Sequence, residues 1–107
     1  MEYKDLYALE EDLHTEFKLA KTKVPLDFYE TYFAFANTDG GDIYLGIEEE
    51  HEKVKGLPGI ANWPMYQKAI LDTIDYGKIK IIGADRKSYK TDGHEKAHIL
   101  FRRVKKK

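Results

Sequence analysis

A helix that leads directly into a strand constrains the fold more than any other feature of this sequence. From residue 26 to residue 36, apolar and aromatic side chains recur at helical spacing. Pro25 suits the first turn of that helix, because the N–H that proline lacks would have no partner there. The pattern ends at residues 37–41, where glycine can adopt the left-handed conformation that closes a helix. A strand over residues 42–47 follows at once, so the helix is expected to pack on a sheet.

The face of this helix that should meet the sheet is broad. It comprises Leu26, Tyr29, Phe33 and Ala36, widened by Phe28, Tyr32 and Phe35. So wide an aromatic face has to be covered, which makes this helix the main packing element of the domain.

The other elements are predicted from shorter patterns. Leu6, Leu9 and Leu13 indicate an N-terminal helix or turn, alternation over residues 15–20 indicates a strand, and residues 53–57 could pair back with the strand over 42–47. A second helix should start after Asn62 and end at Gly77, with a buried face made by Trp63, Tyr66, Ile70 and Ile74. Strands over 78–84 and 96–104 complete an α+β sandwich, in which two main helices cover one face of a mixed sheet.

Length and composition exclude several classes of protein. The 107 residues suffice for a single domain over 1–107, and 42% hydrophobic residues suffice for its core, so disorder is excluded. No apolar run is long enough to span a bilayer, and the acidic N-terminal residues do not resemble a signal peptide. Cysteine is absent, which excludes disulfides, thiolate nucleophiles and cysteine zinc sites. We therefore expect a cytoplasmic protein without contact with a membrane.

The net charge of −1 conceals two halves of opposite sign. Residues 1–52 carry 14 acidic and 4 basic side chains, whereas residues 53–107 carry 5 acidic and 14 basic ones. A basic end of this kind suits a polyanionic partner, unless the two halves interleave in space and neutralise each other.

The basic residues concentrate in a predicted C-terminal β-hairpin, residues 78–104, with a turn at Asp92 and Gly93. Lysine and arginine neutralise phosphates and so give affinity without sequence readout. The expected nucleic-acid contacts are Arg86, Lys87, Tyr89, Lys90, Arg102 and Arg103. The alternative is a solvated edge hairpin that its lysines protect from aggregation.

Two further stretches could carry chemistry. The glycines at 40, 41 and 46 do not fit a nucleotide-binding motif, and a helix C-terminus repels phosphate, so a helix stop is the simpler interpretation. The carboxylates of Glu11, Glu16 and residues 48–50 could hold Mg²⁺ or Mn²⁺ through oxygen ligands, although acidic runs are usually solvated surface.

Several motifs together resemble the Schlafen-type Alba-like domain. They are Glu11-x4-Glu16-Phe17-Lys18, the helix after Pro25, and the run AFANTDGG followed by DIYLGIEE. The match is good over residues 11–57 and continues only as element order beyond them. Its motif positions within the helix stop and the following strand are Phe35, Asn37, Thr38, Gly40, Gly41 and Gly46.

This resemblance implies an Alba-like sandwich that binds nucleic acid, DNA in preference to RNA, in a transcriptional-regulator context. It also implies a homodimer, with the basic hairpin as the nucleic-acid contact and no cofactor. Schlafen proteins that cleave RNA use three carboxylates, which by motif position fall on Glu11, Glu16 and Glu49.

Three hypotheses follow. The first is a non-enzymatic nucleic-acid-binding domain. The second is a metal-dependent endoribonuclease with Glu11, Glu16 and Glu49 as catalytic residues and as ligands of Mg²⁺ or Mn²⁺. The third is a protein-interaction or scaffold domain.

Overall fold

The structure is a computed structural model that describes residues 3–20, 23–60, 62–73, 79–82, 90–91, 94–95 and 99–106. The chain starts with a 3₁₀ helix, η1 (Tyr3–Ala8). The elements that follow are β1 (Thr15–Lys18), α1 (Leu26–Ala36), β2 (Gly41–Leu45), β3 (Glu48–Glu50), β4 (Lys53–Gly56), α2 (Trp63–Thr73), β5 (Ile79–Ile82), β6 (Lys90–Thr91), β7 (His94–Glu95) and β8 (Ile99–Val104).

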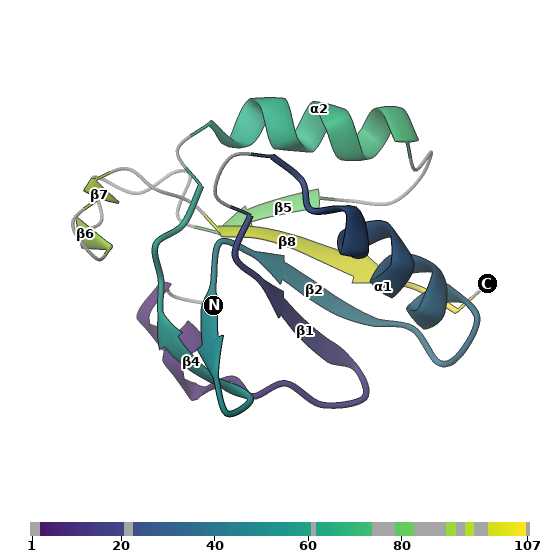
Figure 1. Cartoon of the computed structure of the whole chain (residues 1–107), viewed down its shortest axis with the longest axis horizontal. Coiled ribbons are helices and arrows are strands. Elements are labelled where there is room, and N and C mark those ends of the chain that lie inside the picture. Colours follow the sequence, from purple (N-terminus) through teal and green to yellow (C-terminus); the bar gives the residue numbers. More distant parts are fainter. Residues whose placement is uncertain are drawn as a thin grey trace.

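Four strands form the central sheet, in the order β1-β2-β8-β5 (Figure 1). β1 runs parallel to β2, whereas β8 pairs antiparallel with both β2 and β5. The predicted mixed sheet is therefore confirmed. The last strand of the chain is a central one, so residues far apart in sequence meet along it.

Both helices cover the same face of this sheet, as predicted (Figure 1). Side chains that alternate along β2 and β8 separate the core into two clusters. The cluster under the helices includes Phe28, Phe35, Ile43, Leu45, Tyr66, Ile70, Leu100 and Val104. The cluster on the opposite face packs against η1 and the β3–β4 hairpin and comprises Leu6, Phe17, Tyr44, Ile47, Leu57 and Ile99.

The predicted buried stripe of α1 is wrong in part. Phe28, Phe35 and Ala36 are buried, but Leu26 is 79% exposed and Phe33 is 56% exposed. The helix presents its Phe28 face to the sheet. The ring of Phe35 then lies so close to Gly41 that a Cβ there would come within 2.7 Å of the ring.

Residues 53–56 pair back as predicted, but only with residues 48–50 at the acidic end of the predicted strand. β4 pairs with β3 as a separate two-stranded sheet and not with β2. The division occurs at Gly46, whose φ of 100° ends β2 and turns the chain away from the central sheet. Of the three N-terminal leucines, Leu6 is fully buried and Leu13 is exposed.

The predicted basic hairpin lies largely outside the described residues. Within it, β6 and β7 pair antiparallel on either side of residues 92–93. Arg86, Lys87 and Tyr89 lie outside the described part, as does Ile74 of the second predicted helix. No helix in the described ranges combines the length and the apolar character that a membrane crossing requires.

Candidate functional site

Three glutamates from separate parts of the chain line one hollow of about 330 Å³ beside β1. Glu11 precedes β1, Glu16 lies within it and Glu49 lies in β3. The structure thus brings together the three carboxylates that motif position had selected. Glu48 and Glu50 point elsewhere, because their carboxylates lie 3.5 and 3.8 Å from the ammonium of Lys55.

Backbone hydrogen bonds explain why these elements meet. The N–H groups of Gly46 and Ile47 donate to the carbonyl of Lys18 at 2.7 and 3.2 Å, which holds the chain after β2 against the end of β1. The N–H of Glu11 donates to the carbonyl of Glu52 at 2.7 Å. The β3–β4 turn is thereby joined to the segment before β1.

That turn is one that the sequence does not signal. His51 and Glu52 both have positive φ, 54° and 68°, at positions of a two-residue hairpin loop that usually hold asparagine or glycine. The carboxylate of Glu49 accepts a hydrogen bond from the Glu52 N–H at 3.0 Å and so supports this strained conformation.

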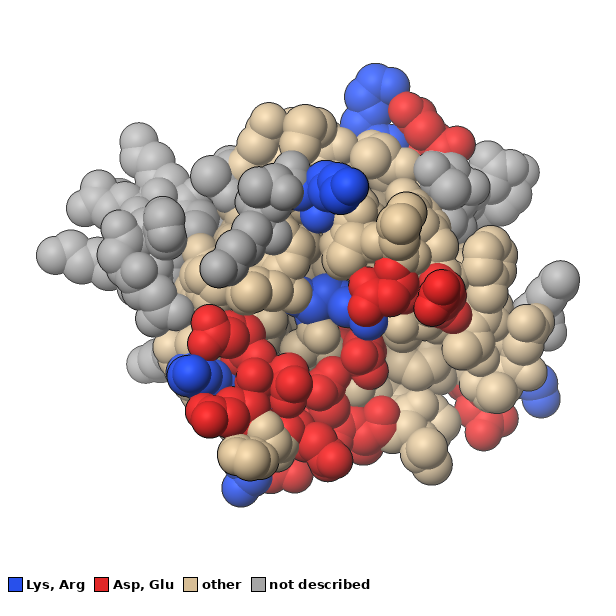
Figure 2. All heavy atoms as spheres, viewed as in Figure 1, with Lys and Arg blue, Asp and Glu red and all other residues tan. Residues whose placement is uncertain are grey.

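Negative charge is concentrated in the glutamate hollow. Burial raises the pKa of Glu11 above its usual 4.5, and the nearby charges of Glu16 and Glu49 add to the increase. The backbone N–H of Phe17, 2.9 Å from Oε2 of Glu11, acts in the opposite direction by stabilising the carboxylate. Figure 2 shows that acidic side chains gather over this part of the surface.

Lys18 is a residue of the hollow that sequence reasoning missed. Its ammonium lies 2.9 Å from Oδ2 of Asp27 in α1 and 3.4 Å from Oε1 of Glu16, and its side chain is only 11% exposed. The sequence does contain a signal for this residue, because side chains alternate along β1 and residues 16 and 18 therefore lie on the same face of the strand.

The donor chemistry of this hollow fits a hard divalent cation, but the arrangement of the donors does not. Carboxylate oxygens are the ligands that Mg²⁺ and Mn²⁺ prefer. Oxygens of Glu11 and Glu49 already accept backbone hydrogen bonds. Across the described residues, no three histidine, cysteine, aspartate or glutamate side chains are grouped so that they could hold a metal ion.

Two of the arginines predicted to contact phosphate, Arg102 and Arg103, lie on opposite faces of β8. Arg102 is 3% exposed on the helix side, with its guanidinium 5.4 Å from the ring centroid of Tyr32. The prediction of Arg102 as a phosphate contact is wrong, because this residue is buried. Arg103 is 66% exposed, and its Nε and Nη2 donate to the two carboxylate oxygens of Asp42 at 3.0 and 3.4 Å.

The AFANTDGG segment ends α1 and then brings the start of β2 close to the end of β8. Thr38 donates its hydroxyl hydrogen to the Ala34 carbonyl at 2.9 Å, and the N–H of Gly40 donates to the Phe35 carbonyl at 2.8 Å. Gly40 has a φ of 82°, and a Cβ there would lie 2.5 Å from the Val104 carbonyl oxygen. Asn37 is the exposed C-cap residue of α1.

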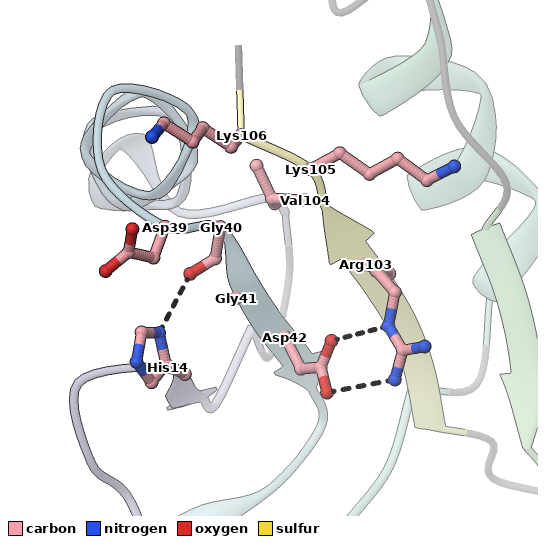
Figure 3. Close-up of a pocket in the computed structure, with 9 residues that line it drawn as sticks. All are labelled: His14, Asp39, Gly40, Gly41, Asp42, Arg103, Val104, Lys105 and Lys106. Carbon is pink, nitrogen blue, oxygen red and sulfur yellow. Dashed lines mark hydrogen bonds and ion pairs between the residues drawn. The ribbon is translucent and has the colours of Figure 1, made fainter.

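A second hollow, of about 380 Å³, opens where this segment meets the end of β8 (Figure 3). We call it the β8-end hollow. Its lining residues are His14, Asp39, Gly40, Gly41, Asp42, Arg103, Val104, Lys105 and Lys106.

Comparisons with known proteins agree with this fold. The family model described as Schlafen, AlbA_2 matches residues 11–94. The chain is similar to the solution NMR structure of an N-terminal domain from Nitrosomonas europaea, whose protein is related by name to the ATP-dependent DNA helicase RecG. The TM-score is 0.67 at 18% identity, over 96% of this chain and 69% of that one, a likeness that shows the fold alone. No curated protein matches the sequence.

Proposed function

Because the chain belongs to the Schlafen AlbA_2 family, with residues 11–94 matched, we propose that it is a nucleic-acid-binding domain. The observation that carries this proposal is the exposed cationic end of β8, formed by Arg103, Lys105 and Lys106. Side chains of this kind neutralise phosphates and position a domain on nucleic acid without reading bases.

In more detail, we propose that the domain binds DNA in preference to RNA. We propose further that it binds as a homodimer and acts in a transcriptional regulator. The neighbour related by name to a DNA helicase supports DNA, and the family resemblance supports the dimer and an Alba-like arrangement of the sandwich. The proposed contacts are Arg86, Lys87, Tyr89, Lys90 and Arg103.

Fluorescence anisotropy with labelled duplex DNA and a structured RNA, at low and near-physiological salt, tests this function. We expect tighter binding of DNA, with affinity that falls steeply as salt rises. Joint replacement of Arg86→Ala and Lys87→Ala should reduce the salt slope by about one unit per lost contact. The control Lys68→Ala, on the exposed side of α2, should bind as wild type does. Absence of binding at either salt would refute the proposal, and a stable oligomer without binding would favour a scaffold.

The glutamate hollow favours a second function, cleavage of a phosphodiester. Glu11 and Glu49 are each oriented by a backbone N–H, and Glu16 lies beside the ammonium of Lys18. As they stand, the three carboxylates do not form a metal site, so this second function requires Glu11 and Glu49 to exchange their backbone hydrogen bonds for a shared Mg²⁺ or Mn²⁺ ion. Lys18 would supply a positive charge for the scissile phosphate.

Incubation of structured RNA with the purified protein in Mg²⁺ or Mn²⁺ tests this second function. We expect cleavage by wild type, loss of cleavage in Glu16→Gln, and unchanged cleavage in the control Glu30→Gln, which alters an exposed residue of α1. Intact RNA with either metal would rule the function out. Equal loss in both variants would show that the effect is not specific to the hollow.

A further inference from the structure

We propose that the β8-end hollow is a binding site for a phosphate group, and that nucleic acid supplies this phosphate. The inference rests on the proposed function and deepens it, because it assigns phosphate recognition to a defined site. Backbone of Gly40, Gly41 and Val104 lines the hollow beside the side chains of Arg103, Lys105 and Lys106 (Figure 3).

Arg103 provides the fixed positive charge of the site. Asp42 engages one edge of its guanidinium, through Nε and Nη2, and so fixes the direction of the planar group. A guanidinium carries five N–H groups, and those that Asp42 does not use remain for a ligand. The same hydrogen bonds raise the pKa of Arg103, which keeps the group charged.

Lys105 and Lys106 provide the mobile part of the charge. Both side chains are exposed just beyond β8, and Figure 3 shows them extending in opposite directions from the end of the strand. Flexible lysine stems can bring their ammonium groups onto a bound anion from either side. Arg103 and Asp42 offset each other, and Asp39 offsets one of the two lysines, so the three cations and two carboxylates of the lining leave a net charge of +1.

The end of α1 does not prevent such a site, although a helix C-terminus disfavours anions. The Phe33 carbonyl accepts a hydrogen bond from Asn37, and the Phe35 carbonyl accepts from Thr38 and Gly40, so these terminal acceptors are satisfied. The loop itself is held by His14, whose Nδ1 lies 3.2 Å from the Gly40 carbonyl oxygen. Recognition would therefore come from the cationic side chains and not from loop amides.

The site is also separate from the glutamate hollow. His14 lies just before the start of β1, whereas Lys18 and Ala20 of the glutamate hollow lie at and beyond the end of that strand. A four-residue strand separates its ends by roughly 10 Å. The β8-end hollow and the glutamate hollow share no lining residue.

NMR spectra of the ¹⁵N-labelled full chain test the proposal, with the amides of Gly40 and Gly41 as reporters. Inorganic phosphate, a 5′-phosphorylated oligonucleotide and its 5′-hydroxyl counterpart are titrated separately. We expect both glycine amides to shift with phosphate and with either oligonucleotide. Joint replacement of Lys105→Gln and Lys106→Gln should weaken binding about tenfold at low salt, whereas the control Lys53→Gln on β4 should not.

The outcomes separate this site from the proposed function. Oligonucleotide binding that leaves Gly40 and Gly41 unshifted would overturn the site and leave the function intact. Shifts with inorganic phosphate, without oligonucleotide binding, would support the site and refute the function. If neither ligand binds, both fail. Shifts limited to the 5′-phosphorylated oligonucleotide would support the site as one for a terminal phosphate.

Discussion

Gly40 is a residue at which the fold leaves no room for a side chain. Its φ of 82° favours glycine, and a Cβ would meet the Val104 carbonyl oxygen at 2.5 Å. The obstacle is the backbone of a central strand, which cannot rotate away as a side chain could. The glycine therefore serves two needs, closure of α1 and the approach of β8.

Gly40→Ala should lower the free energy of unfolding by at least ~2 kcal/mol, because it adds both strain and a clash. Urea denaturation followed by far-UV circular dichroism measures this change. Asp39→Ala, at the exposed neighbouring position, should change the stability by less than about 0.5 kcal/mol. Equal effects of the two substitutions would contradict the argument.

Glu11 should show how the crowded carboxylates affect stability. The folded protein binds the Glu11 proton at higher pH than the unfolded chain, because burial and the neighbouring charges raise its pKa. Its charge therefore destabilises the fold at pH 7, and this penalty is relieved as pH falls through the raised pKa.

Glu11→Gln should accordingly raise the free energy of unfolding at pH 7 by ~0.5 kcal/mol, a magnitude typical of surface charges. The amide oxygen can still accept the Phe17 N–H. Urea titrations at pH 7, and again below the usual carboxyl pKa of 4.5, should show the difference shrinking at the lower pH. A variant less stable than wild type at pH 7 would refute this account.

At the scale of elements, α1 shows what periodicity can and cannot decide. Leu26 and Phe33 lie on one apolar stripe of this helix and Phe28 and Phe35 on another, so the pattern predicts a helix without choosing its buried face. The choice is made by the sheet, where Gly41 leaves space for the ring of Phe35.

Phe28→Ala should therefore cost about 3–5 kcal/mol of unfolding free energy, whereas Leu26→Ala should cost less than about 0.5 kcal/mol. Chemical denaturation of the two variants in parallel measures both values. A larger loss of stability in Leu26→Ala than in Phe28→Ala would show that the Leu26 and Phe33 stripe is the buried one.

The candidate site, like the buried face of α1, was predictable from the sequence only in part. Motif resemblance selected Glu11, Glu16 and Glu49, whereas an acidic run alone offers no reason to prefer residue 49 over its neighbours. That preference depends on β4, because Lys55 of this strand forms ion pairs with Glu48 and Glu50 and leaves Glu49 to line the hollow. Lys18 was missed for a related reason, because its partner Asp27 lies on an element whose orientation the sequence leaves open.

For the molecule as a whole, the two core clusters share the strands that separate them. Ile43 and Leu45 of β2 belong to one cluster, and Tyr44 between them belongs to the other. β8 divides its side chains in the same way, with Leu100 and Ile99 on opposite faces. Neither cluster can lose its packing without disturbing the strands of the other.

Unfolding should consequently be a single transition. Ile47→Ala, in the cluster opposite the helices, should lower stability by about 2–5 kcal/mol. The fluorescence of Trp63, the only tryptophan, reports on the helix side and should shift its midpoint together with the circular dichroism signal. A Trp63 transition that stays at the wild-type midpoint would show that the two sides unfold independently.

The placement of two neighbouring arginines on opposite faces of β8 also bears on the pairing register of this strand. A strand that joined the sheet one residue out of step would turn every side chain to the wrong face. Arg103 would then lose its ion pair with Asp42, and Leu100 and Val104 would leave the cluster under the helices. The alternation of side chains along β8 therefore favours the native register, the one register that combines the Arg103–Asp42 ion pair with burial of Leu100 under the helices.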